Sequence, residues 1–158
     1  MAINFNLRKA TKGDLVFLFN LRNEESVRKA SFNIEAISLE THSKWLQNKL
    51  LDKISQIFIA EVNSQPIGMA RFDLINEKEA EVNVAVTEKF QGKGYGSEIL
   101  HQSSVKFLEI FPKVNLIYAF IKSDNQASLR SFAKAGYQLL GEAKHNGQIC
   151  MEMILRKI

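Results

Sequence analysis

A glycine-rich loop is the clearest chemical feature of this sequence. It reads Gln91-Gly92-Lys93-Gly94-Tyr95-Gly96, and it separates a segment of alternating apolar residues from a segment with helical spacing. Three glycines let the backbone turn sharply, and the first turn of the following helix adds unpaired N–H groups at the positive end of its dipole. Such a turn can hold a pyrophosphate. Lys93 and Ser97 could add an ammonium group and a hydroxyl group to the same site.

The loop does not fit two other phosphate-binding motifs. It lacks the Gly-Lys-Ser/Thr ending of the nucleotide-binding P-loops. A dinucleotide-binding fingerprint follows an early parallel strand, whereas this loop follows a predicted antiparallel meander. Taken alone, the loop is equally compatible with a tight strand-to-helix turn that binds no ligand.

The periodicity of apolar residues predicts an α/β fold with a mixed, mostly antiparallel central sheet and helices on both faces. Alternating and β-branched runs predict strands at residues 3–7, 56–62, 67–75, 80–86, 114–121, 137–143 and 148–155. Helices are expected to begin near Thr11 or Gly13 and after Ser38, and to cover residues 95–111 and 125–135. The polar stretch 23–37 is predicted to be irregular and to pass over a pocket.

The composition is that of an ordinary globular protein. A length of 158 residues predicts one domain, residues 1–158, and the apolar runs are too short to span a membrane. The formal charge of +4 suits an anionic ligand, but no basic run indicates nucleic acid. The single cysteine, Cys150, is expected to be a buried small side chain. A chain without an internal disulfide fits a reducing compartment, so the cytoplasm is the expected location.

Two motifs resemble those of one enzyme family. The glycine loop resembles the Gln/Arg-x-x-Gly-x-Gly/Ala signature of the GNAT N-acetyltransferases, which use acetyl-CoA. Asn125-Gln126-Ala127-Ser128, followed by Lys134-Ala135-Gly136-Tyr137, is similar to the family's Asn-x-x-(Ala/Ser)…Lys-x-Gly-Phe/Tyr pattern. The predicted element order, β-α-α-β-β-β-α-β-α-β-β, is also the order of that family and covers nearly the whole chain. The resemblance implies transfer of an acetyl group to a primary amine.

The resemblance also implies where acetyl-CoA binds. In the family, the fourth and fifth strands splay apart and the pantetheine arm pairs with strand backbone, which corresponds here to Val84, Ala85 and Val86. The glycine loop would take the pyrophosphate, and Asn125 would bond the pantetheine or the far end of the cofactor. Lys134 would contact the 3′-phosphate, although a solvated helix lysine is an equal alternative.

The catalytic residues implied by the family are partly replaced here. Many members protonate the departing thiolate with a tyrosine, whose position holds Phe132 in this sequence. Ser128, one helical turn earlier, is the candidate instead, directly or through a water. Glu81 on the fourth strand is the candidate base for the amine proton, with an ordinary surface glutamate as the equal alternative. A backbone N–H near Val86 would stabilise the oxyanion.

The N-terminal half resembles the amino-sugar acetyltransferases of pseudaminic-acid type, which act on a nucleotide-linked 4-amino sugar. The shared pattern and its neighbouring strands suggest a substrate site made of Arg22, Asn23, Arg28, His42, Trp45, Arg71 and Asn83. The arginines could meet phosphates, and His42 with Trp45 could stack on a sugar or base. Two alternatives stay open: a peptide acetyltransferase of ribosomal-protein type, and an acyl-CoA-binding sensor without turnover. The family resemblance also allows a homodimer, and no metal site is expected.

Overall fold

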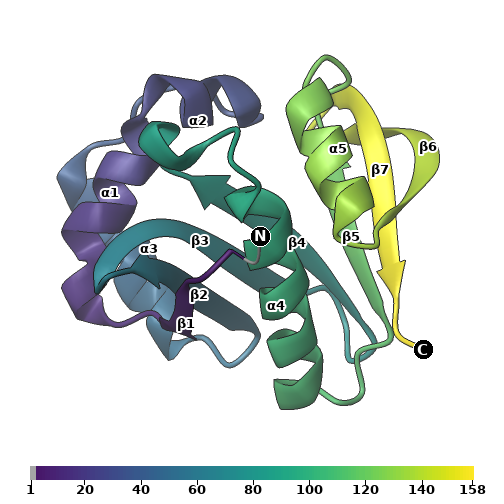
Figure 1. Cartoon of the computed structure of the whole chain (residues 1–158), viewed down its shortest axis with the longest axis horizontal. Helices are drawn as coiled ribbons and strands as arrows, with labels where there is room; N and C mark the ends of the chain where they lie inside the picture. The colour runs from purple at the N-terminus through teal and green to yellow at the C-terminus, as the bar shows by residue number, and fades with distance from the viewer. Residues whose placement is uncertain (1–2) are drawn as a thin grey trace.

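The computed structural model describes residues 3–158, which form one seven-stranded sheet in the order β1-β2-β3-β4-β5-β7-β6 (Figure 1). All neighbouring strands are antiparallel except β4 and β5. The strands are β1 (Asn6–Lys9), β2 (Ser55–Val62), β3 (Gln65–Leu74), β4 (Glu79–Val86), β5 (Leu116–Ile121), β6 (Gln138–His145) and β7 (Gln148–Arg156). The α-helices are α1 (Leu15–Asn23), α2 (Glu25–Ala30), α3 (Leu39–Leu51), α4 (Tyr95–Ile110) and α5 (Gln126–Lys134). Short 3-10 turns, Lys12–Asp14 and Glu88–Phe90, precede α1 and the glycine loop.

The fold class predicted from the sequence is confirmed, with two corrections. The first strand lies at Asn6–Lys9 rather than at residues 3–7, because the backbone of this segment pairs with Phe58 to Glu61 of β2. Arg8 is also held by the carboxylates of Asp14 (2.7 Å) and Glu61 (3.1 Å). The stretch 23–37 is not irregular throughout, since Glu25–Ala30 forms α2. None of the α2 side chains is fully buried, so this short helix left no apolar stripe in the sequence.

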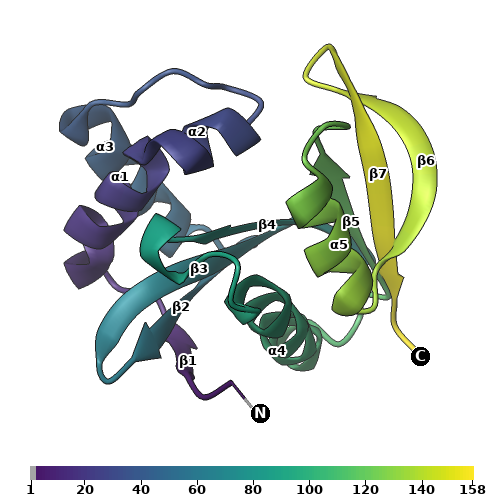
Figure 2. The ribbon, with the colours of Figure 1, turned by 45° about the horizontal axis from the view of Figure 1, so that its top comes forward.

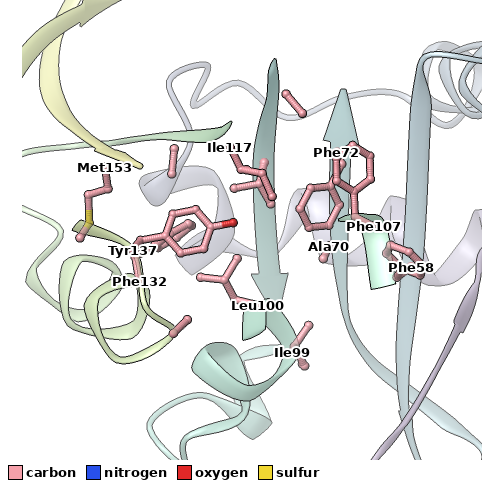
Figure 3. Close-up of a cluster of buried hydrophobic side chains, with 14 of the residues drawn as sticks. Phe58, Ala70, Phe72, Ile99, Leu100, Phe107, Ile117, Phe132, Tyr137 and Met153 are labelled. Carbon is pink, nitrogen blue, oxygen red and sulfur yellow. The ribbon is translucent and has the colours of Figure 1, made fainter. Parts of the chain in front are cut away.

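The helices cover both faces of the sheet, and each face has its own apolar core. Figure 2 shows α1 and α3 on one side of β2–β4 and α4 on the other. Alternate residues of β2 divide between the two cores: Ile57 and Ile59 pack toward α1 and α3, whereas Phe58 and Ala60 pack toward α4. In the core on the α4 side, Phe72 stacks on Phe107 at 4.5 Å between ring centroids (Figure 3). Within residues 3–158, no helix is both long and apolar enough to cross a membrane.

β4 and β5 pair over only three residues. Their parallel ladder joins Glu79 with Leu116, then Ala80 with Ile117, and ends where Glu81 meets Tyr118. Beyond this point β4 stays paired with β3 as far as Val86, while β5 stays paired with β7. The two halves of the sheet therefore splay apart, and the edge of β4 that faces β5 carries no strand after Glu81 (Figures 1 and 2).

We expect Gly68→Ala to destabilise the protein because β3 and β4 pack closely at this residue. A Cβ at position 68 would lie 2.9 Å from the Ala85 carbonyl oxygen and 3.2 Å from Ile99 Cδ1. Overpacking of this kind should lower the free energy of unfolding by about 1–3 kcal/mol, measured by chemical denaturation. Gly13→Ala is the control, because its new Cβ would meet its nearest neighbour, Thr11 Oγ1, at an ordinary 3.4 Å. Equal free energies of unfolding for the two variants would show that β4 shifts at little cost to accommodate the added Cβ.

Candidate functional site

The glycine loop has the backbone geometry that the sequence predicted. Gly92 and Gly94 have φ angles of 73° and 89°, in the left-handed region that glycine favours. Gly94 is the N-cap of the 16-residue helix α4, and no side chain of residues 3–158 caps that end. The N–H groups of the first turn of α4 are therefore available to an anion, and the helix dipole favours negative charge there.

Several predicted loop side chains shape the loop itself. The Gln91 amide donates to the carbonyl oxygen of Val86 (2.9 Å) and to Ser26 Oγ (3.1 Å), which ties the loop to the end of β4 and to α2. The Ser97 hydroxyl donates to the Gly94 carbonyl oxygen at 3.1 Å. Tyr95 packs edge-on against Phe5 and Phe90. Lys93 is exposed, with its ammonium group 5.7 Å from the centre of the Phe90 ring.

The loop, the end of β4 and α5 converge at one place. A Cβ at Gly96 would lie 3.7 Å from Ser131 Oγ on α5 and 3.9 Å from Val86 Cγ2 on β4. The predicted pantetheine backbone, Val84 to Val86, belongs to the part of β4 that has left β5. The glycine loop, the end of β4 and helix α5 therefore lie next to one another.

The predicted residues of α5 have mixed surroundings. Asn125 Oδ1 accepts the backbone N–H of Ser128 (3.1 Å), so Asn125 is the N-cap of the helix. Ser128 is half-buried, and Lys134 is exposed near the other end of α5. Phe132 is buried, with its ring edge-on to Tyr137 at 5.1 Å (Figure 3). The Phe132 side chain is therefore part of the core.

The opposite face of β4 carries the predicted base. The strand register places Glu81 beside Asp73 and Asn83 beside Arg71, so these four side chains share the face away from α4. Asp73 is already paired, with Arg71 at 2.9 Å and with Lys49 at 2.8 Å. Glu81 Oε1 lies 3.3 Å from Nε2 of His145, a residue that the sequence analysis did not single out.

The predicted arginines gather beside this face. Arg22 Nη2 donates to the Asn33 carbonyl oxygen (2.9 Å), and Arg28 Nε donates to the Asn23 carbonyl oxygen (3.2 Å). Within residues 3–158, Arg22 Nη1 is buried without a hydrogen-bond partner. Burial, and then the positive charges of Arg28 and Arg71, lower the pKa of Arg22. The cluster is therefore a half-buried concentration of positive charge.

His42 and Trp45 extend the arginine cluster along α3. The two rings lie 5.2 Å apart, and the Arg71 guanidinium sits 5.2 Å from the Trp45 ring centre. His42 is only 4% exposed, and no group among residues 3–158 bonds its Nε2. Burial, followed by the charge of Arg22, lowers the pKa of His42. A neutral imidazole is therefore favoured at this position.

Asn23, another predicted substrate residue, is held by the protein. Its Oδ1 accepts from the Ile37 N–H (2.8 Å), and its Nδ2 donates to the Ile37 carbonyl oxygen (2.9 Å). The Asn23 side chain therefore joins the end of α1 to Ile37, the last residue of the segment 24–37. Within residues 3–158, no group of three or more His, Cys, Asp or Glu side chains could hold a metal ion.

The sequence profile of the acetyltransferase (GNAT) domain matches residues 4–138, which is most of the chain. The chain belongs to the GNAT acetyltransferase family. This GNAT protein is 22% identical over 147 residues to acetyltransferase PseH of Campylobacter jejuni (strain 81-176), with 93% of this chain and 91% of the relative covered. It is 23% identical over 155 residues to spermidine N(1)-acetyltransferase of Escherichia coli (strain K12), with 93% and 82% covered.

The solved structure of AAC(6')-Ib in complex with ribostamycin and coenzyme A has the same fold. Its TM-score is 0.85 at 20% identity, with 98% of this chain and 94% of that chain covered. Family membership makes the chain an acetyltransferase with acetyl-CoA as its co-substrate. This assignment favours an enzyme over the acyl-CoA sensor that the sequence alone left open.

We expect acetyl-CoA to stabilise the folded protein through the glycine loop. At about 100 times its dissociation constant, the ligand should add about 2.7 kcal/mol to the free energy of unfolding, seen as a rise in Tm. Gly94→Val should abolish this rise, because the left-handed φ strains any side chain and the new side chain would block the approach of the pyrophosphate to the loop backbone.

The control for backbone strain is Gly147→Val. Gly147 has a similar φ of 75° in the β6–β7 turn, and a Cβ there meets nothing within 4 Å. This variant should lose stability but keep the rise in Tm with acetyl-CoA. A full rise in Gly94→Val would remove the loop from the cofactor site.

Proposed function

We propose that this GNAT enzyme acetylates the amine of an amino sugar that carries phosphate, in particular a nucleotide-linked 4-amino sugar. The observation that carries the proposal is the cluster of Arg22, Arg28 and Arg71, in which Arg71 lies opposite Asn83, two residues along β4 from Glu81. Within residues 3–158, neither Arg22 nor Arg28 lies within salt-bridge distance of a carboxylate, and both donate to backbone carbonyls instead. Two neighbouring arginines that make no ion pair are suited to bind an anion.

The charge of the cluster distinguishes between classes of amine. Spermidine and aminoglycosides are polycations, so Arg22 and Arg28, which make no ion pair, would repel them. A phosphate would reverse the sign of the interaction and would give Arg22 Nη1 the hydrogen-bond partner that it lacks. His42 Nε2, also buried without a partner, could bond a sugar hydroxyl or a phosphate oxygen. The relation to acetyltransferase PseH supports the same branch of the family.

The proposed reaction is direct attack of a neutral amine on the acetyl thioester. Glu81 accepts the ammonium proton at the point where β4 and β5 separate. A backbone N–H near Val86, on the unpaired edge of β4, stabilises the oxyanion. The unpaired edge and the first turn of α4 hold the pantetheine and the pyrophosphate. Ser128 or a water supplies the proton to the departing thiolate.

A panel of acceptors tests the substrate class. We expect CoA release with a nucleotide-linked 4-amino sugar to exceed release with spermidine, an aminoglycoside or an N-terminal peptide by at least tenfold in kcat/KM. The free amino sugar, without its nucleotide, should react poorly because it cannot use the arginines. Preference for the peptide would support the ribosomal-protein type, and preference for spermidine would refute the anion site.

Arg28→Gln tests the arginine cluster directly. Loss of a charged hydrogen bond worth about 1.5–3 kcal/mol should raise the KM for the nucleotide sugar by tenfold or more, with little change in kcat. The KM for the free amino sugar should stay the same. Lys44→Gln is the matched control, because it removes one positive charge from an exposed position on α3. Equal KM values for Arg28→Gln and the wild type would contradict the proposal.

Glu81→Gln tests the proposed base. The amide keeps the size of the side chain but cannot take a proton, so kcat/KM should fall by roughly tenfold to a thousandfold. The rise in Tm with acetyl-CoA should persist, because the cofactor binds elsewhere. Glu79→Gln, two residues earlier on the same face of β4, is the control and should keep near-normal turnover. Near-normal turnover in Glu81→Gln as well would move the role to another group or to water.

A further inference from the structure

Glu81 has a partner from a distant part of the chain. His145, at the end of β6, places Nε2 3.3 Å from Glu81 Oε1, and the two side chains are 23% and 36% exposed. The His145 ring lies parallel to Phe120 of β5 at 4.4 Å and edge-on to Phe32 at 5.0 Å. Two aromatic rings from different elements thus fix the imidazole beside the carboxylate that is the proposed base.

The surrounding contacts hold this arrangement together across the splayed strands. Gln148 Nε2 donates to the Phe32 carbonyl oxygen, and Lys122 Nζ donates to the Lys29 carbonyl oxygen, both at 2.9 Å. These bonds join the β6–β7 turn and the end of β5 to α2 and the segment that follows it, which face each other in Figure 2. His145 therefore lies where the two halves of the protein meet, at the rim of the proposed acceptor site.

The charged and titratable groups around the pair come from four strands. The strand register places these side chains on the same face as the pair: Arg71 and Asp73 of β3, Glu79 of β4, Tyr118 of β5 with Lys122 just after it, and Cys150, Glu152 and Arg156 of β7. Cys150 is buried, Lys122 is engaged with Lys29, and Asp73 is paired with Arg71 and Lys49. Among residues 3–158, His145 supplies the ion-pair contact to the Glu81 carboxylate.

We propose that His145 is a proton-relay residue for Glu81. The Glu81 carboxylate takes a proton from the acceptor ammonium, so an N–H bond breaks and an O–H bond forms. That proton then passes to the unprotonated Nε2 of His145, which restores the carboxylate. Nδ1 of the resulting imidazolium releases its proton to solvent, which leaves the Nε2–H tautomer. After the products leave, Nδ1 takes up a proton from solvent and Nε2 gives one up to solvent, which restores the starting Nδ1–H tautomer. The inference rests on the proposed function, since it needs Glu81 as the base.

The relay has a physical reason. Bound acceptor and acetyl-CoA would displace water from Glu81, so the protonated carboxyl would have no direct route to solvent. An imidazole can serve as a general base and accept the proton of a neighbouring carboxyl group. The partly exposed ring of His145 then links the site to bulk water. A purely structural ring would need only the stacking on Phe120 and Phe32.

Three substitutions separate the relay from a structural role, assayed by CoA release with whichever amine of the panel is acetylated. His145→Phe keeps an aromatic ring, and His145→Gln keeps a hydrogen-bonding group toward Glu81. Both should fold with a Tm near the wild type, yet lose about tenfold to a hundredfold in kcat at neutral pH. His145→Ala should be similarly slow, but added imidazole should restore turnover, with the rescue rising with pH as the imidazole free base increases.

The matched control is Phe32→Leu, which loosens the packing around His145 and leaves the imidazole in place. This variant should change KM and should show no dependence on added imidazole. Normal kcat in His145→Phe and His145→Gln would overturn the relay while leaving the acetyltransferase function intact. Slow variants that imidazole does not rescue, with the loss mainly in KM, would overturn it in favour of a positioning role. If the wild type releases no CoA with any amine of the panel, the proposed function and the relay are both wrong.

Discussion

The parallel ladder between β4 and β5 ends after three residue pairs, and the site depends on this early ending. Backbone N–H and C=O groups that leave a ladder must find other partners or water. From Val82 to Val86, the edge of β4 that faces β5 is therefore a row of groups able to pair with an extended, amide-containing ligand. The same divergence leaves Glu81 at the branch point, as the last residue paired with β5. In the proposed reaction, cofactor and acceptor meet at this carboxylate.

Two arginines of the protein, Arg8 and Arg22, have opposite electrostatic surroundings, one typical of a stabilising ion pair and the other of a binding site. Arg8 is paired with Asp14 at 2.7 Å and with Glu61 at 3.1 Å, and these bonds raise its pKa. Arg22 bonds only a carbonyl oxygen, and its pKa is lowered by burial and by neighbouring positive charges. The first arrangement stabilises the start of the sheet. The second costs stability in the unliganded protein, a cost that an anionic substrate would remove.

The sequence predicted the parts whose signals are local. Alternation located β4 within one residue, and the glycines with the following apolar spacing located the start of α4 at Tyr95. It missed α2, because that helix is short and buries no side chain completely. It also missed His145, whose partners Phe32, Glu81 and Phe120 are distant in sequence, so no spacing rule could join them. Features set by neighbouring residues could be predicted from the sequence, whereas contacts between residues distant in the chain could not.

The distribution of ionisable groups suggests which of the two proton transfers in the proposed reaction is the more demanding. On the proposed acceptor side, Glu81 and His145 lie 3.3 Å apart and form the pair that is proposed to take up the ammonium proton. On the side of the departing thiolate, α5 presents Phe132 inside the core, and the hydroxyl of Tyr137 bonds Ser104 in a buried site. A primary ammonium holds its proton firmly at neutral pH, whereas a thiol has a pKa near 8.5, so a thiolate leaves readily without a strong acid. Removing the ammonium proton is then the harder proton transfer. If the ionisable side chains of the proposed site serve that transfer, Phe132 can stand where many family members have a tyrosine.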